Sequence, residues 1–239
     1  MATVYAGTSG YAYAAWKPAF YPQDVPAARF LEHYATRLTC VEINYTFRRT
    51  PSEKTLSAWV KATPPGFVFA LKMHQRVTHA HRLKESGRES LEYFLGTLAP
   101  LKEAGRLGPV LLQMPPNLKA DAGRLRRFLE FLPRDVRFAF EFRDRSWFSD
   151  EVFELLGEHG AALCVAESEE LSTPDVVTAD FAYYRLRKPP YDEPSLARLR
   201  QRADELTAGG RDVYLIFKHE EDAGGALEAE RVLAGGPSG

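Results

Sequence analysis

Short apolar runs alternate with amphipathic stretches along the whole chain. The runs are rich in β-branched and aromatic residues and are bounded by glycine, proline or charge, which is typical of buried strands. Three of the amphipathic stretches follow a helix-capping residue, namely Ser52, Asp121 and Ser149. The pattern predicts strands at residues 3–7, 40–44, 67–72, 109–113, 137–142, 162–166, 181–186 and 212–217, and helices near residues 26–37, 52–61, 86–105, 121–131, 149–159, 193–208 and 223–234.

Eight strands separated by helices indicate a parallel sheet with crossover connections. Eight strands also close a (β/α)8 barrel, and 239 residues suit that fold. An open, doubly wound sheet would need a glycine-rich phosphate turn after the first strand, which GTSG at residues 7–10 does not match. We therefore expect a TIM-like closed barrel as a single domain over residues 1–234, with a weak or missing helix at 167–180 and a flexible tail at 235–239.

Strand alternation directs a polar side chain into the barrel near the carboxyl end of most strands. In the fifth strand, three phenylalanines share one face, and Glu141 and Arg143 share the other. In the sixth strand we expect Val165 and Glu167 to point inward. Barrel enzymes build their active sites at this rim. The inward polar set is Glu42, Asn44, Lys72, Gln113, Glu141, Arg143, Glu167, Arg185 and Lys218.

Composition narrows the possible functions. Apolar residues make up 45% of the chain and charged residues 26%, as in a folded globular protein. With only two cysteines, the chain cannot be a disulfide scaffold. The net charge of −1 indicates neither a nucleic-acid partner nor a membrane partner. We find no apolar stretch long enough to span a bilayer and no signal peptide, so we expect a cytoplasmic protein. The local excess of positive charge at residues 72–88, which include His79, suggests an anion-binding loop or a solvated surface.

The rim residues favour acid–base chemistry on an anion. Glu141 and Glu42 are the candidate catalytic carboxylates, with Arg143 expected to keep Glu141 ionised. Lys72, Arg143 and Arg185 would clamp an anionic group, although Lys72 also suits a Schiff-base role. Gln113, Asn44 and His79 are further candidate substrate contacts. Tyr11 and Trp147 lie in loops where each either stacks on a substrate or packs onto the barrel.

Other chemistries have less support from the residues. Lysine and arginine are interleaved with the acids at the rim, which disfavours a multi-metal site, and we expect neither a metal nor another cofactor. The rim charges also suit a purely structural salt-bridge network, because buried charges must be paired.

Several short motifs are distributed along almost the whole chain. They include GTSGY at residues 7–11, VEINYTF at 41–47, FALK at 69–72, LGPVLLQMPP at 107–116, EFR at 141–143, SWF at 146–148 and YRL at 184–186. This set resembles the domain of unknown function 72 family, also called YecE-like proteins. The resemblance implies a TIM-like barrel of the broad group that includes endonuclease IV and xylose isomerase, and it implies no established activity.

The chain departs from the family pattern in its last third. Arg187 and Lys188 replace a usual His-Gly, Lys218 and His219 replace a usual Asn-Asn, and Glu167 stands where Asp is usual. We predict an enzyme that acts, by hydrolysis as the default reaction, on a phosphorylated or otherwise anionic small molecule. The alternatives are a nucleic-acid phosphodiesterase or nucleic-acid binder and a non-catalytic anion-binding barrel. The oligomeric state stays open.

Overall fold

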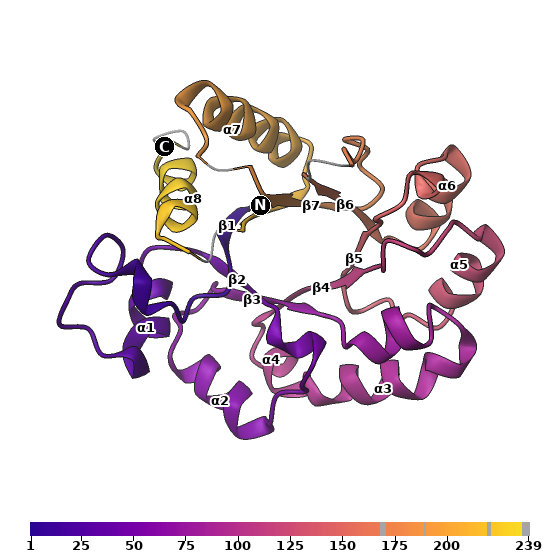
Figure 1. The fold of residues 1–239 in the computed structure, drawn as a ribbon, viewed down its shortest axis with the longest axis horizontal. Coiled ribbons are helices and arrows are strands. Elements are labelled where there is room, and N and C mark those ends of the chain that lie inside the picture. Colours follow the sequence, from indigo (N-terminus) through magenta and orange to yellow (C-terminus); the bar gives the residue numbers. More distant parts are fainter. Residues whose placement is uncertain (168–170, 189, 219–220, 236–239) are drawn as a thin grey trace.

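The computed structural model describes residues 1–167, 171–188, 190–218 and 221–235. Eight parallel strands form a closed barrel in which each strand pairs with its neighbours in sequence and β8 pairs with β1 (Figure 1). The predicted (β/α)8 fold is therefore confirmed. The strands are β1 (Val4–Ser9), β2 (Cys40–Ile43), β3 (Val68–Lys72), β4 (Leu107–Gln113), β5 (Phe138–Glu141), β6 (Ala162–Ala166), β7 (Phe181–Leu186) and β8 (Asp212–Phe217).

The helices surround the barrel (Figure 1). Side chains of Ser52, Asp121 and Ser149 each accept a hydrogen bond from a backbone N–H in the first turn of the following helix, as predicted. The described residues between β6 and β7 contain no helix. The helices are α1 (Phe30–Ala35), α2 (Glu53–Lys61), α3 (Arg88–Thr97), α4 (Ala99–Glu103), α5 (Ala122–Leu129), α6 (Asp150–Glu158), α7 (Glu193–Ala208) and α8 (Gly224–Ala234).

The predicted helix over residues 86–105 is divided into α3 and α4. Pro100 lies in the first turn of α4, where its missing N–H costs no hydrogen bond, whereas in a continuous helix it would remove one. In the tail, Gly235 forms a turn, and residues 236–239 lie outside the described residues.

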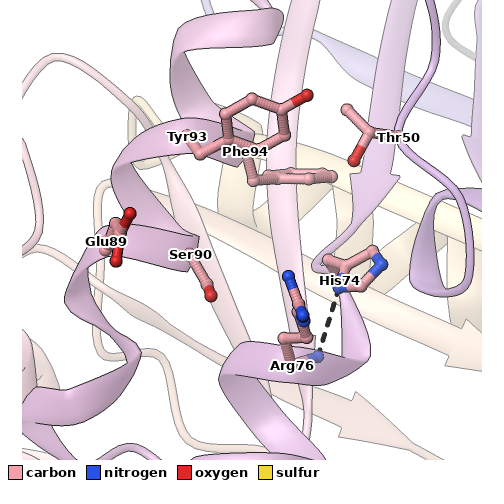
Figure 2. Close-up of a pocket in the computed structure, with 7 residues that line it drawn as sticks. All are labelled: Thr50, His74, Arg76, Glu89, Ser90, Tyr93 and Phe94. Carbon is pink, nitrogen blue, oxygen red and sulfur yellow. Dashed lines mark hydrogen bonds between the residues drawn. The ribbon is translucent and has the colours of Figure 1, made fainter.

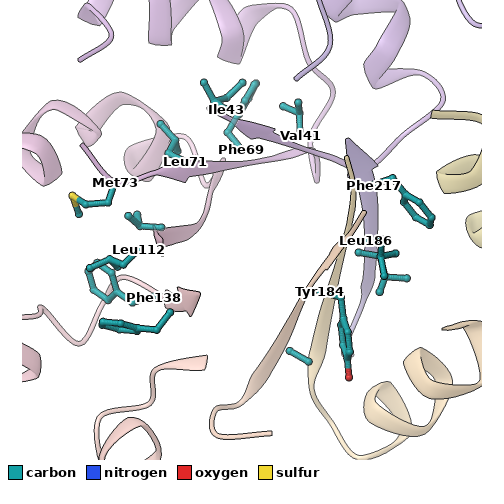
Figure 3. Packing of buried hydrophobic residues seen from close by; sticks show 14 of the residues in the cluster. Val41, Ile43, Phe69, Leu71, Met73, Leu112, Phe138, Tyr184, Leu186 and Phe217 are labelled. Atoms are coloured by element: carbon teal, nitrogen blue, oxygen red, sulfur yellow. The ribbon is translucent and has the colours of Figure 1, made fainter. Parts of the chain in front are cut away.

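The apolar core has two layers. Alternate residues of the strands face the helices, and Figure 3 shows Val41, Ile43, Phe69 and Leu71 on that side. Full burial of such a side chain contributes ~1.5–3 kcal/mol. A second cluster fills the barrel interior, made of Cys40, Val68, Ala70, Leu111, Ala139, Ala162, Cys164, Ala166, Phe181, Tyr183, Tyr214 and Ile216.

The predicted facing of β6 was wrong. Ala162, Cys164 and Ala166 line the interior, whereas Val165 packs with the helix layer. The large ring of Tyr183 on the adjacent β7 occupies the interior here, so small side chains from β6 fit beside it. The run ALCVA has no polar residue to mark its inward face, which is why alternation could not set its register.

Candidate functional site

The carboxyl ends of the strands surround a cavity of about 530 Å³ at the mouth of the barrel. At this end of a (β/α)8 barrel, side chains from several strands meet one bound molecule. Six of the described residues that line the cavity are Lys or Arg, and none is Asp or Glu. They are Asn44, Tyr45, Phe47, Arg48, Lys72, Gln113, Arg143, Arg185, Arg187 and Lys218.

Three buried charged side chains form a network at the base of this cavity. Arg185 of β7 donates one hydrogen bond to Glu42 Oε1 and another to Glu141 Oε2, each 2.6 Å long. The exposed fractions of Glu42, Glu141 and Arg185 are 0%, 1% and 2%. Removing one partner of such a buried group strongly destabilises a protein, because it leaves a charge without compensation. The network therefore fixes the guanidinium of Arg185 in one orientation.

Glu42 is enclosed by donors on both carboxylate oxygens. The Tyr183 hydroxyl donates to Oε2 at 2.8 Å, and the Ser9 hydroxyl donates to Oε1 at 3.0 Å. Asn44 in turn donates its side-chain N–H to the Ser9 hydroxyl. Glu42 thus receives hydrogen bonds from β1 and β7, and it does not line the cavity.

Glu141 accepts hydrogen bonds on both oxygens as well. Gln113 Nε2 donates to Oε2 at 2.9 Å, and the Arg187 guanidinium donates to Oε1 at 2.8 Å. Burial raises the pKa of Glu141, but the charges of Arg185 and Arg187 and the Gln113 hydrogen bond outweigh it and lower the pKa to about 2. The carboxylate reaches only a small pocket of about 50 Å³.

The arginines that keep Glu141 ionised are not the one expected from the sequence. Arg143 is exposed and forms no ion pair with Glu141. It follows the end of β5 and lines the cavity instead. Arg185 and Arg187, two residues apart on the same face of the β7 segment, neutralise the carboxylate.

Lys72, the last residue of β3, is half-buried and points into the cavity. Its Nζ donates to Gln113 Oε1 at 2.7 Å and lies 4.4 Å from the centre of the Phe47 ring. Burial and the charge of Arg185 lower the pKa of Lys72 to about 8, although the Glu42 and Glu141 charges oppose this shift. A substantial fraction of the amine is therefore neutral near physiological pH.

The two predicted aromatic contacts lie away from the cavity. Trp147 is fully buried, stacks on Phe142 at 4.5 Å and donates its indole N–H to the Leu118 carbonyl at 2.7 Å. Tyr11 packs on Tyr34 with a ring separation of 6.1 Å. Trp147 has no free face for a ligand, so it supports the loop, and Tyr11 does not line the mouth.

Two predicted polar residues also lie beside the site. His79 is half-buried, hydrogen-bonds to the Thr78 hydroxyl at 2.9 Å and packs edge-on against Phe47. Burial and the charges of Lys72 and Arg143 lower its pKa, so the neutral imidazole is favoured. Glu167 was expected to point inward, but its carboxylate accepts hydrogen bonds from the Arg187 backbone and the Tyr191 hydroxyl, away from the cavity.

Four lining residues are additions to the inward polar set predicted from the sequence, namely Tyr45, Phe47, Arg48 and Arg187. Arg187 lies two residues after Arg185, and extending the strand alternation past Leu186 would have found it. Phe47 and Arg48 lie at the end of a short 3₁₀ turn after β2, where alternation does not apply. His219, which follows Lys218, lies outside the described residues.

Two further cavities continue from the mouth toward α3. The nearer, of about 650 Å³, shares Tyr45 and Arg48 with the mouth, and the farther, of about 330 Å³, shares Thr50 and Tyr93 with the nearer one. Figure 2 shows the farther cavity, with His74 and Arg76 opposite residues of α3. Tyr45 and Tyr93 are 44% and 67% exposed, unusually high for large aromatic side chains in this barrel.

Neither a metal cluster nor a membrane span is found in the part of the chain that the structure describes. No group of three or more His, Cys, Asp or Glu side chains there is arranged to hold a metal ion. No helix among the same residues has the length and apolarity required to cross a membrane.

The fold and the site define a (β/α)8-barrel protein with a cation-lined mouth. The family described as "Protein of unknown function DUF72" matches residues 5–235, and the chain belongs to this family. The resemblance seen in the sequence motifs is therefore confirmed.

Relatives of the chain agree with this assignment. A crystal structure of a DUF72 family protein from Thermotoga maritima MSB8 has 28% identity and a TM-score of 0.84, covering 97% of this chain and 98% of that one. UPF0759 protein YunF of Bacillus subtilis is 30% identical over 56% of this chain, and the match spans 49% of that protein. A D-psicose 3-epimerase from Clostridium cellulolyticum H10 has 9% identity and a TM-score of 0.60, covering 98% and 97% of the two chains, which shows a shared fold.

Proposed function

We propose that the barrel mouth binds a small phosphorylated or carboxylated molecule and catalyses its conversion. The observation that carries this proposal is the lining of the mouth by six cations with no acidic side chain among the described residues. Arg48, Arg143 and Lys218 form no ion pair within that part of the chain. An anionic ligand would supply the missing counter-charge through charge-assisted hydrogen bonds worth ~1.5–3 kcal/mol each.

The buried glutamates have a positioning role in this proposal. A general base works best with a pKa near the operating pH, and that of Glu141 is about 2. Glu42 is enclosed by three donors and does not reach the cavity. Both carboxylates orient Arg185, which faces the ligand. The sequence suggested an acid–base role for these glutamates, with hydrolysis as the reaction. In this proposal Lys72 has that role instead, because its pKa of about 8 suits proton transfer.

A binding titration tests the proposed site. Inorganic phosphate, sulfate and sugar phosphates are expected to raise the melting temperature, since a ligand of the folded state stabilises it. Arg143→Gln should weaken affinity roughly ten- to hundredfold by removing a charge-assisted hydrogen bond. Arg145→Gln, in the same loop but outside the cavity, is the matched control and should bind as wild type. Equal affinity of wild type and Arg143→Gln, or no binding of any anion, would refute the proposal.

A second candidate function has its own observation. The connected cavities toward α3 combine the exposed rings of Tyr45 and Tyr93 with Arg49 and Arg76, which form no ion pair among the described residues. Arginines that contact phosphates and aromatic rings that stack on bases are the features of a single-stranded nucleic acid site. This arrangement favours the nucleic-acid alternative, with the strand running from the mouth along α3.

Fluorescence anisotropy with a labelled oligothymidine tests this candidate. Tyr93→Ala should lose ~1–3 kcal/mol of binding free energy, whereas Tyr93→Phe keeps the ring and should bind normally. Affinity should fall steeply as salt rises, because phosphate contacts release counterions. Salt-independent affinity, or equal binding by the two Tyr93 variants, would exclude a nucleic-acid-binding function at these cavities.

A further inference from the structure

The Lys72 amine differs from the other cations of the mouth in the partner that it contacts. Its hydrogen-bond acceptor is the neutral amide oxygen of Gln113, at 2.7 Å. No carboxylate among the described residues lies within 4.0 Å of it, whereas Arg185 and Arg187 are both ion-paired. Glu141 holds the other end of the Gln113 amide, through the 2.9 Å bond from Nε2, so the amide oxygen is turned toward Lys72. The amine is thus held in one place without a counter-charge in contact.

The surroundings of the amine favour its neutral form. The Phe47 ring covers one side at 4.4 Å and keeps water from it. Burial and the charge of Arg185 lower the pKa of Lys72, and the charges of Glu42 and Glu141 oppose this shift. With a pKa of about 8, roughly a quarter of the amine is neutral at pH 7.5, against about one part in a thousand for an ordinary lysine.

We propose that Lys72 forms an imine with the carbonyl group of an anionic substrate. The inference rests on the proposed anion site and narrows its ligand to a 2-oxo acid or a phosphorylated aldehyde or ketone. The carboxylate or phosphate group would contact the ammonium of Lys218 and the guanidinium of Arg143, which forms no ion pair with any described residue. The carbonyl would then lie over Nζ, inside the same cavity of about 530 Å³. A neutral amine in a cationic, partly desolvated cavity is the state that such chemistry requires.

The step balances without any oxidant or further reactant. The lone pair of Nζ attacks the carbonyl carbon, a C–N bond forms, and the resulting carbinolamine carries the former carbonyl oxygen as a hydroxyl. That C–O bond then breaks, and the oxygen leaves as water with the two protons that Nζ loses. Uptake of one proton from solvent gives the protonated imine, which withdraws electrons from the adjacent carbon and permits a neighbouring C–H or C–C bond to break. Hydrolysis finally restores the amine.

Pyridoxal 5′-phosphate is a suitable probe, because it carries both an aldehyde and a phosphate. After incubation and reduction with borohydride, mass spectrometry of the peptides identifies each labelled lysine. We expect Lys72 to be labelled at least roughly tenfold faster than the exposed Lys54, since its larger neutral fraction outweighs its lower basicity. Inorganic phosphate should slow the labelling of Lys72 and leave Lys54 unaffected.

Matched variants separate the imine from simple anion binding. Lys72→Arg keeps the charge but forms no imine, so its visible imine absorbance should be lost. Lys54→Arg changes an exposed lysine that does not line the cavity and should keep that absorbance. Equal labelling rates for Lys72 and Lys54, or an unchanged imine in Lys72→Arg, would overturn the imine. In that case retained phosphate binding by wild type would leave the anion site standing, and loss of both would overturn the two proposals together.

Discussion

Replacing Glu141 by glutamine tests whether the buried charge network stabilises the barrel. The carboxylate accepts two hydrogen bonds on Oε2 and one on Oε1. In the amide, one of these positions becomes a donor and faces another donor. The less costly orientation turns the new NH₂ toward Arg187, whose side chain is 16% exposed and can move toward solvent. Arg185 would then keep one charged partner, Glu42, and one neutral acceptor, the amide oxygen at position 141.

The magnitude follows from the pKa of Glu141. A value of about 2 in the folded protein, against 4.5 for an ordinary glutamate, corresponds to about 3 kcal/mol of stability from the charged form. Loss of one partner from a buried ion group gives a similar figure, ~3–5 kcal/mol. For a chain of this size, 1 kcal/mol shifts the melting temperature by ~2–4 °C. We expect Glu141→Gln to melt roughly 6–12 °C below wild type near pH 7.

The pH dependence gives a second readout of the same charge. Because folding depresses this pKa, the stabilisation is fully present above about pH 4.5 and is lost as the pH falls toward 2. The difference in melting temperature between wild type and Glu141→Gln should therefore shrink by roughly half between pH 6 and pH 3.

Differential scanning calorimetry measures both effects, with Glu92→Gln as control. Glu92 makes an exposed ion pair with Arg88, and solvent screening is expected to leave it little effect on stability. A melting temperature for Glu141→Gln within 2 °C of wild type, or a difference that stays constant with pH, would refute the reasoning.

Two other outcomes follow from the site and its supports. Sulfate affinity of wild type should fall as the pH rises through about 8, because Lys72 loses its charge. Lys72→Arg should bind sulfate equally at pH 7 and pH 9. Isothermal titration calorimetry measures both affinities, and parallel pH profiles of the two proteins would contradict the prediction. Trp147→Ala should lose ~3–5 kcal/mol of unfolding free energy in urea because the indole is fully buried, and Trp147→Phe should lose less; a loss below 1 kcal/mol would show that the loop does not depend on the ring.

Much of the fold was predictable because strand alternation is a local signal. Val41 and Ile43 flank Glu42 with large apolar groups, so the inward direction of Glu42 follows from three consecutive residues. The same holds for Arg185 between Tyr184 and Leu186. The method failed in β6, where no residue of ALCVA is polar or large enough to distinguish the faces.

The pairing of the charges was not predictable in this way. Arg143 is near Glu141 in sequence, but the bond to Glu141 is made by Arg185, 44 residues later. Such a pairing depends on distances across the barrel, which alternation does not contain. Arg48 was missed because it belongs to a turn after β2, where neither strand nor helix periodicity locates a side chain. The sequence therefore located most of the cations at the mouth, but only the closed barrel shows that no acid lies among the described residues that line it.

The Arg185 network has a consequence for the order in which the chain becomes stable. Glu42 comes from β2 and Glu141 from β5, so both acids are synthesised well before the arginine of β7 that joins them. A fragment that ends after β6 would bring two carboxylates into the barrel without the guanidinium between them. We expect the strands of such a fragment not to close into a barrel until β7 is added. The protein is thus a poor candidate for division into independently folding halves, although its (β/α) units are alike in form.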